Sequence, residues 1–224
     1  RSTIPERGTG PRGRIQVGEP GRVRTMKARL LQPTSSEWAD ALTRMDHDFF
    51  HTPGYTALQA RWVGGEPRAL SVQDGTDELL LPLVVRPIRG GGRDATTPYG
   101  YSGPVVTDRS HKDFIGRALA EGVGSLADEG LVSLFVRLHP LLDVDIPPSV
   151  GPTVTHGDTV VVDLSLDETE LWRQTRRDHK NQINRAKRTG QRAVFETDHR
   201  HEQDFERLYL ETMRRLDASD EYRY

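Results

Sequence analysis

The feature that most limits the fold of this chain is its short supply of apolar segments from which a core can be built. Hydrophobic residues make up 34% of the 224 residues, and the mean hydropathy is -0.65. Two apolar runs, 79–85 and 131–138, are long enough to form buried strands. We therefore expect that one part of the chain folds around these runs and that another part does not.

The first 26 residues are the clearest part that lacks core-forming material. Residues 1–25 hold five glycines, three prolines and six arginines. This composition cannot bury enough surface to offset the entropy lost on ordering. We predict that residues 1–26 are a disordered basic arm or a non-native leader, because Met26 resembles a natural start.

The remaining pattern predicts an α/β (α+β) fold. Apolar residues recur at helical spacing behind the N-cap candidate Ser35, whereas strand-like runs surround the turn at Asp74 and Gly75. A glycine- and tyrosine-rich loop, 97–104, comes after a flexible triple glycine at 90–92. The expected helices are 35–46, 55–63, one carrying Phe114 to Leu126, 167–189 and 201–216, and the expected strands are 69–72, 79–85, 131–138, 159–164 and 192–197.

Composition also excludes several classes of chemistry. The chain has no cysteine, so it can hold no disulfide, thiolate nucleophile or zinc-thiolate site. No apolar run approaches the roughly 18 residues of a membrane span. The default expectation is a cytoplasmic protein. Its net charge of -2 means that attraction to an anionic partner would have to come from a local patch.

Three common motifs fail on their context. Residues 8–13 match the letters G-x-G-x-x-G, but a proline-rich tail supplies neither the strand nor the helix of a dinucleotide loop. His47 and His51 stand four residues apart without a glutamate base between them, so we predict no metal site there. No G-x-S-x-G motif is present, so the sequence gives no support for serine hydrolase chemistry.

One segment, from Leu171 to Arg192, is abruptly basic. Between residues 173 and 188, seven Lys and Arg residues face a single Asp, a local balance of +6. Like charges at i,i+4 repel one another, so a phosphate-rich partner would stabilise such a helix. The alternative interpretation is a solvated helix without a ligand. If the segment binds phosphate, the expected contacts are Arg177, Lys180 and Arg185.

The loop at 97–104 carries the second candidate site. Tyr99 and Tyr101 flank Gly100 between two prolines. These aromatics either pack within the loop itself or form a rim with phenolic hydroxyls for a polar ligand.

These two segments together resemble a known family. Residues 94–104 read DATTPYGYSGP, and residues 173–190 read R-x-x-R-R-x-x-K-N-x-I-x-x-A-x-x-x-G. They are similar to the two signatures of the FemAB-type (peptidoglycan interpeptide bridge) aminoacyltransferases, a branch of the GNAT-like acyltransferases. A run at 205–215, F-x-x-x-Y-x-x-T-M-x-R, resembles the next segment of that family's chains.

The resemblance implies two GNAT-like halves, each a mixed β-sheet with flanking helices. Residues 27–165 would form the complete first domain, and 166–224 the incomplete start of a second. Such a C-terminally truncated fragment would be inactive alone. The loop signature Q/R-x-x-G-x-G/A of acyl-CoA enzymes is absent, which counts against coenzyme A as the donor.

The implied activity is acyl or aminoacyl transfer to an amine, without a bound cofactor or metal. The donor would be aminoacyl-tRNA or, alternatively, acyl-CoA, and the acceptor a nucleotide- or lipid-linked muropeptide-type precursor. No catalytic base can be named from the sequence, and a non-catalytic RNA-binding or scaffolding protein remains the alternative. The expected substrate-binding residues are Tyr99, Tyr101, Arg177, Lys180, Asn181 and Arg185.

Overall fold

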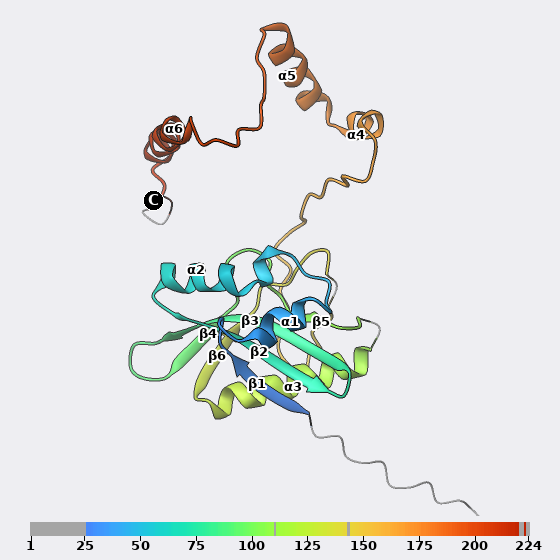
Figure 1. The fold of residues 1–224 in the computed structure, drawn as a ribbon, viewed down its shortest axis with the longest axis vertical. Helices are drawn as coiled ribbons and strands as arrows, with labels where there is room; N and C mark the ends of the chain where they lie inside the picture. Colours follow the sequence, from blue (N-terminus) through green and yellow to red (C-terminus); the bar gives the residue numbers. More distant parts are fainter. Residues whose placement is uncertain (1–25, 110, 143, 220–221, 223–224) are drawn as a thin grey trace, which may run out of the picture. The chain divides into compact units, whose positions relative to one another are not determined.

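The computed structural model of this chain describes residues 26–109, 111–142, 144–219 and 222 (Figure 1). The chain divides into two compact units, the first ending at Thr159 and the second beginning at Val160. The prediction of a basic arm at 1–26 falls, except for Met26, outside the described residues.

A six-stranded mixed sheet forms the centre of unit 1, which confirms the expected mixed α/β architecture. The strand order is β1-β2-β3-β4-β6, and β5 pairs separately with β3. All neighbours are antiparallel except β4 and β6, which run parallel. The strands are β1 (Lys27–Leu31), β2 (Glu66–Asp74), β3 (Asp77–Pro87), β4 (Arg93–Thr96), β5 (Val105–Val106) and β6 (Leu131–Phe135).

The predicted hairpin is present and is longer than the pattern indicated. Strand β2 pairs with β3 over its whole length, with Leu70 opposite Leu81, and Gly75 in the turn takes a left-handed φ of 68°. Three strands had no sequence signal that we recognised, β1, β4 and the two-residue β5. The expected strand 131–138 ends at Phe135.

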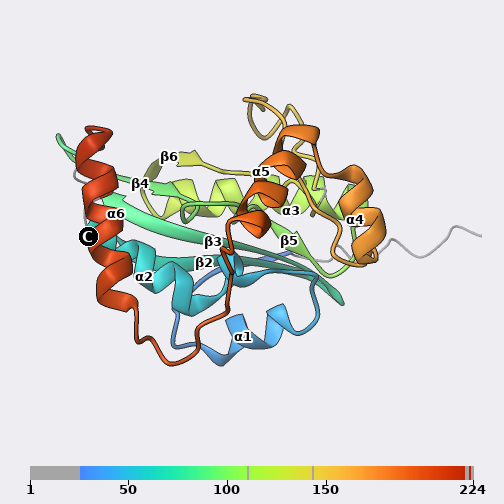
Figure 2. The ribbon, with the colours of Figure 1, turned by 90° about the horizontal axis from the view of Figure 1, so that it is seen from above.

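Helices cover both faces of the sheet (Figures 1 and 2). They are α1 (Ser36–Leu42), α2 (Pro53–Val63) and α3 (Lys112–Asp128), with a short 3-10 turn η1 (Phe49–His51) between the first two. Helix α1 begins at its predicted cap, since the Ser35 hydroxyl accepts a hydrogen bond from the Glu37 N–H at 3.2 Å. The expected helix 35–46 was too long, because the structure ends α1 at Leu42.

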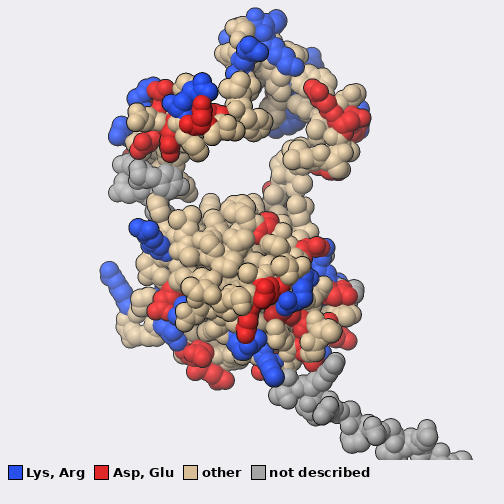
Figure 3. Space-filling model, viewed as in Figure 1, with Lys and Arg blue, Asp and Glu red and all other residues tan. Residues whose placement is uncertain are grey.

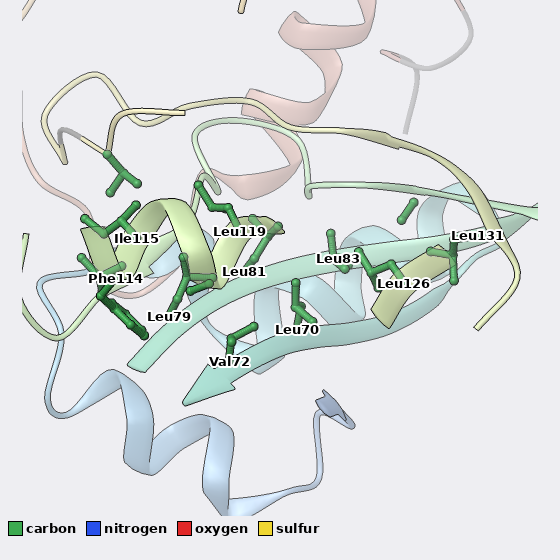
Figure 4. Packing of buried hydrophobic residues seen from close by; sticks show 14 of the residues in the cluster. Leu70, Val72, Leu79, Leu81, Leu83, Phe114, Ile115, Leu119, Leu126 and Leu131 are labelled. Atoms are coloured by element: carbon green, nitrogen blue, oxygen red, sulfur yellow. The ribbon is translucent and has the colours of Figure 1, made fainter. Parts of the chain in front are cut away.

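Alternating residues of β2 and β3 build two cores, one on each face. Leu70 and Leu81 pack with α3, as Figure 4 shows for the larger cluster. Ala69 and Leu80 point to the opposite face and pack with Trp38 and Leu42 of α1. The near-continuous apolar run of β3 is explained by this burial on both faces.

Within its described residues, unit 2 contains three α-helices, α4 (Glu168–Gln174), α5 (Arg177–Arg188) and α6 (Glu202–Arg215). The prediction of one helix over 167–189 was wrong, because Thr175 adopts an extended conformation (ψ 132°) that ends α4. The strands expected at 159–164 and 192–197 were also wrong, since neither segment pairs with a described strand. No described residue from 160 onward is buried.

One further prediction concerned the membrane. Within the described ranges, every helix is too short or too polar to cross a bilayer. The cytoplasmic location remains a prediction.

Candidate functional site

The first candidate site lies where the only parallel pair of strands in the described sheet ends. Strands β4 and β6 run in the same direction, so their carboxyl ends meet at one edge. Ligands of open α/β sheets bind outside the carboxyl ends of the strands. The buried Thr97 ties the segments after β4 and β6 together: its N–H donates to the Phe135 carbonyl (3.0 Å), and its hydroxyl accepts from the Arg137 N–H (3.0 Å).

The loop 97–104 holds both predicted tyrosines at this edge. The residues Tyr99 and Tyr101 are 66% and 40% exposed, so they offer a surface to a ligand. Two hydrogen bonds fix the loop backbone to the segment that holds Phe50 and Tyr55. The Tyr55 hydroxyl donates to the Tyr99 carbonyl (3.0 Å), and the buried Ser102 hydroxyl donates to the Phe50 carbonyl (3.1 Å). The loop therefore packs against its neighbours, while ligand binding by the exposed tyrosines stays a prediction.

Gly100, between the two tyrosines, is required by the geometry. Its φ of 93° is left-handed, and a Cβ added there would lie 2.4 Å from Cε1 of Phe50. The Tyr101 ring meets the rings of Phe50 and His139 edge-on, at centroid distances of 5.9 and 6.0 Å. The glycine therefore lets an aromatic cluster close over the loop.

Asp48 organises the floor of this site. Its carboxylate accepts from the Phe50 N–H (2.8 Å) and from Nε2 of His139 (2.8 Å). Nδ1 of His139 accepts from the N–H groups of Leu141 and Leu142 (3.1 and 3.0 Å), which places the imidazole proton on Nε2. Both ring nitrogens of His139 are therefore hydrogen-bonded, Nε2 to Asp48 and Nδ1 to the backbone that follows His139.

His51 is the second histidine on Asp48. Its side chain is fully buried, with Nδ1 3.0 Å from the Asp48 carboxylate. Burial lowers the pKa of His51 below its ordinary value of 6.5, although the Asp48 charge opposes that shift. His47 does not share a helix with it, because η1 begins at Phe49 and its N-cap, Asp48, is extended. In the part of the chain that the structure describes, no cluster of three metal-ligating side chains occurs.

Arg137 is a residue of this site that the sequence analysis missed. Its guanidinium lies 4.9 Å from the Phe135 ring centroid and 5.9 Å from that of Tyr99. Its Nη1 donates to the Thr96 hydroxyl and to the Thr97 carbonyl, both at 3.1 Å. The signal that could have found it is a lone arginine inside the apolar run 131–138.

The second candidate site is the face of α5 in unit 2, which carries the other four predicted residues. With 100° between successive residues, Arg177, Asn181, Asn184 and Arg188 fall on one stripe. Lys180 and Lys187 flank the stripe on one side and Arg185 on the other. Figure 3, viewed as Figure 1, shows Lys and Arg side chains gathered over α5. We call these seven residues the cationic face.

The cations of this unit differ in their partners. Arg173 and Arg176 pair with Glu170 (2.6 Å) and Asp178 (3.2 Å). Nζ of Lys180 and of Lys187 each lie 5.7 Å from the Trp172 ring centroid, and Lys180 also donates to the Arg173 carbonyl (3.1 Å). The remaining cations of α5 are Arg177, Arg185 and Arg188, and no hydrogen bond or ion pair with a described residue engages their side chains.

The predicted residues thus form two groups in two different units: the tyrosines in unit 1, and Arg177, Lys180, Asn181 and Arg185 in unit 2. Comparison with family models, curated proteins and solved structures found no match for this chain. The fold and sites define a mixed α/β protein with an aromatic loop beside a fixed arginine and a separate cationic helix.

Proposed function

We propose that this chain is part of an acyl- or aminoacyltransferase that acts on an amine, with the cationic face binding phosphate groups of its substrates. The observation that carries the proposal is the set of three α5 arginines without a carboxylate partner among the described residues. Guanidinium groups bind phosphate oxygens through two parallel hydrogen bonds, so these side chains suit a phosphate-bearing ligand.

The substrates are inferred from the family resemblance together with this face. The donor is aminoacyl-tRNA, and the acceptor is a nucleotide- or lipid-linked muropeptide-type precursor that meets Tyr99 and Tyr101. Acyl-CoA, which also carries phosphates, is the alternative donor. The mixed sheet with flanking helices is the architecture that a GNAT-like domain requires, and it supports this proposal without being specific to it.

The chemistry places few demands on side chains. Transfer passes through a tetrahedral oxyanion, which backbone N–H groups can stabilise, and the acceptor amine must be neutral to attack. His139 does not supply the base in this arrangement, because both of its ring nitrogens are occupied.

A second candidate function is RNA binding without catalysis. It is favoured by the length of the cationic face, since the eleven steps from Arg177 to Arg188 span about 16 Å along a helix. Such a face reaches farther than one diphosphate and fits the regularly spaced phosphates of a nucleic acid strand.

The test is transfer to amine acceptors by the full-length protein, because this chain is expected to be inactive alone. It is read by mass spectrometry, with aminoacyl-tRNA and acetyl-CoA as parallel donors. The triple variant Arg177→Gln/Lys180→Gln/Arg185→Gln should raise the KM of the phosphate-bearing substrate. It should also lower the slope of log affinity for tRNA against log salt by about 2 to 3, close to one unit per lost contact.

The matched control removes the same charge from arginines that already have partners, Arg173→Gln/Arg200→Gln/Arg207→Gln. It should leave the salt slope nearly unchanged. Equal losses in the two triple variants would refute a specific phosphate site on α5. Binding of tRNA without transfer from either donor would establish the second candidate in place of the first.

A further inference from the structure

We infer that Arg137 is a binding residue for a carboxylate of the ligand that occupies the edge formed by β4 and β6. The inference rests on the proposed function only in treating that ligand as the amine acceptor. It adds to the acceptor a second chemical feature, a carboxylate, to which the proposed function assigns no residue.

Arg137 lies at the carboxyl-terminal edge of the parallel strands, where ligands of open α/β sheets bind. It stands two residues after the end of β6, and its side chain is bonded to Thr96 and Thr97 at the end of β4. Tyr99, whose ring is mostly exposed, comes after the same strand end and contacts the guanidinium. A ligand bound at this edge would therefore meet the guanidinium and the tyrosine together.

The guanidinium of Arg137 is held by hydrogen bonds at Nη1, and its opposite edge makes none with a described residue. Nη1 is engaged by the Thr96 hydroxyl and the Thr97 carbonyl. Nε and Nη2, on the other edge, make no hydrogen bond with a described residue. These two N–H groups point in parallel, the arrangement that matches the two oxygens of a carboxylate.

The charge of Arg137 is also uncompensated. The side chain is half-buried, and no described carboxylate forms an ion pair with it. Two acidic side chains of this region already have partners, since Asp94 is bound twice by Arg86 (3.0 and 2.7 Å) and Asp48 by His139. A partly desolvated cation without a counter-charge favours an anionic ligand.

The surroundings favour an organic carboxylate over a free phosphate. Phe135 and Tyr99, which flank the guanidinium, are 55% and 66% exposed, so their rings offer apolar area beside the charge. An amino acid or a peptide end uses both features, because its carboxylate meets Arg137 while its aliphatic part covers the rings. Inorganic phosphate would use only the charge.

The experiment measures binding to the full chain, without any donor, by calorimetry and by the ¹⁵N resonances of arginine Nε–H groups. The probes are the tripeptide Ala-Ala-Lys with a free carboxylate, the same peptide as its C-terminal amide, and inorganic phosphate. The wild-type chain should bind the free acid about tenfold more tightly than the amide, because a charge-assisted bidentate contact is lost in the amide. Only the acid should shift the Nε–H resonance of Arg137.

Arg137→Gln should abolish the preference for the acid, and Arg137→Lys should retain only part of it, since lysine lacks the paired N–H edge. Arg89→Gln is the control, because Arg89 is an exposed arginine of the same unit that makes no ion pair with a described residue. Thr96→Val leaves Arg137 in place but removes one of its two anchors, so it should reduce the preference even if Arg137→Gln fails to fold.

Equal binding of acid and amide by the wild-type chain would overturn the inference. So would phosphate binding as tight as that of the free acid, which would assign the site to phosphate. The proposed function fails separately. Carboxylate preference without transfer by the full-length protein would refute the transferase proposal alone. Transfer that does not depend on the acceptor carboxylate would refute this inference alone.

Discussion

The two units of this chain handle their apolar residues in opposite ways. In unit 1, fifteen buried residues on one face of the sheet and eight on the other form continuous clusters. In unit 2, none of the residues in α4, α5 and α6 is buried, and Phe205 and Leu208 of α6 are 70% and 55% exposed. Unit 1 has a core that stabilises it, whereas unit 2 has amphipathic helices with no core of their own.

This difference separates two kinds of binding site. The loop site of unit 1 rests on buried groups such as Thr97 and Ser102, which fix its geometry before a ligand arrives. The cationic face of unit 2 lies on a helix with no buried residue, and its side chains are exposed except for the half-buried Lys180. Short helices of this kind gain little stability in water from their own hydrogen bonds, so we expect the ligand to contribute to the stability of α5.

The largest expected contrast comes from removing the same atoms in the two units. Leu81→Ala should cost about 2 to 5 kcal/mol of unfolding free energy, because Leu81 is 1% exposed within the larger core. Leu208→Ala removes an identical group from the exposed face of α6 and should change stability by less than about 0.5 kcal/mol. Urea denaturation followed by circular dichroism measures both, and similar losses would contradict the comparison.

A smaller effect is expected at the loop of unit 1. Gly100→Ala introduces both a left-handed strain and a clash with the Phe50 ring, and we expect a loss of about 1 to 3 kcal/mol. Gly64→Ala separates the two causes, because Gly64 also has a positive φ (67°) but open space around its Cβ position. Thermal melting should therefore show a smaller loss for Gly64→Ala, and equal losses would argue against a tight contact at Phe50.

The smallest expected effect is a pH dependence that arises in unit 1. Burial lowers the pKa of His51 below 6.5, so protonation favours the unfolded chain. Its stabilising contribution is complete above pH 6.5 and is lost as the pH falls through that value toward the lower folded pKa. His51→Asn should remove this slope in unfolding free energy measured from pH 8 to pH 5.

The control for that experiment has the opposite sign. Hydrogen bonding to Asp77 raises the pKa of His111, whose contribution is therefore complete below pH 6.5 and is lost as the pH rises through the raised folded pKa. His111→Asn should make the loss of stability at low pH steeper. A pH profile that neither substitution alters would show that these two histidines are not linked to folding.

The fold of unit 1 was predicted where the sequence pattern is set locally. The β2–β3 hairpin is expected from apolar strands around Asp74 and Gly75, and α1 from its Ser35 cap. Strand β4 was missed because it contains charged residues, and the Arg86–Asp94 ion pair that joins it to β3 depends on pairing across the sheet. The expected strand at 159–164 failed for the converse reason: an apolar run needs a partner strand, and local pattern does not supply one.

The candidate sites were predictable to a similar degree. Local composition marked Tyr99, Tyr101 and the basic segment, but the break at Thr175 that separates α4 from α5 was not foreseen. Arg137 could not be assigned from its neighbours in sequence, because its partners Thr96 and Thr97 lie about forty residues away. Only the parallel pairing of β4 with β6 brings these residues together.

Amide hydrogen exchange of the full chain, with and without uncharged tRNA at low salt, tests the contrast between the units most directly. We predict strong protection of β2 and β3 in both conditions. In α5 we predict fast exchange without tRNA and a clear gain of protection when tRNA is present. Protection of α5 equal to that of β3 without ligand, or no gain with tRNA, would contradict this contrast.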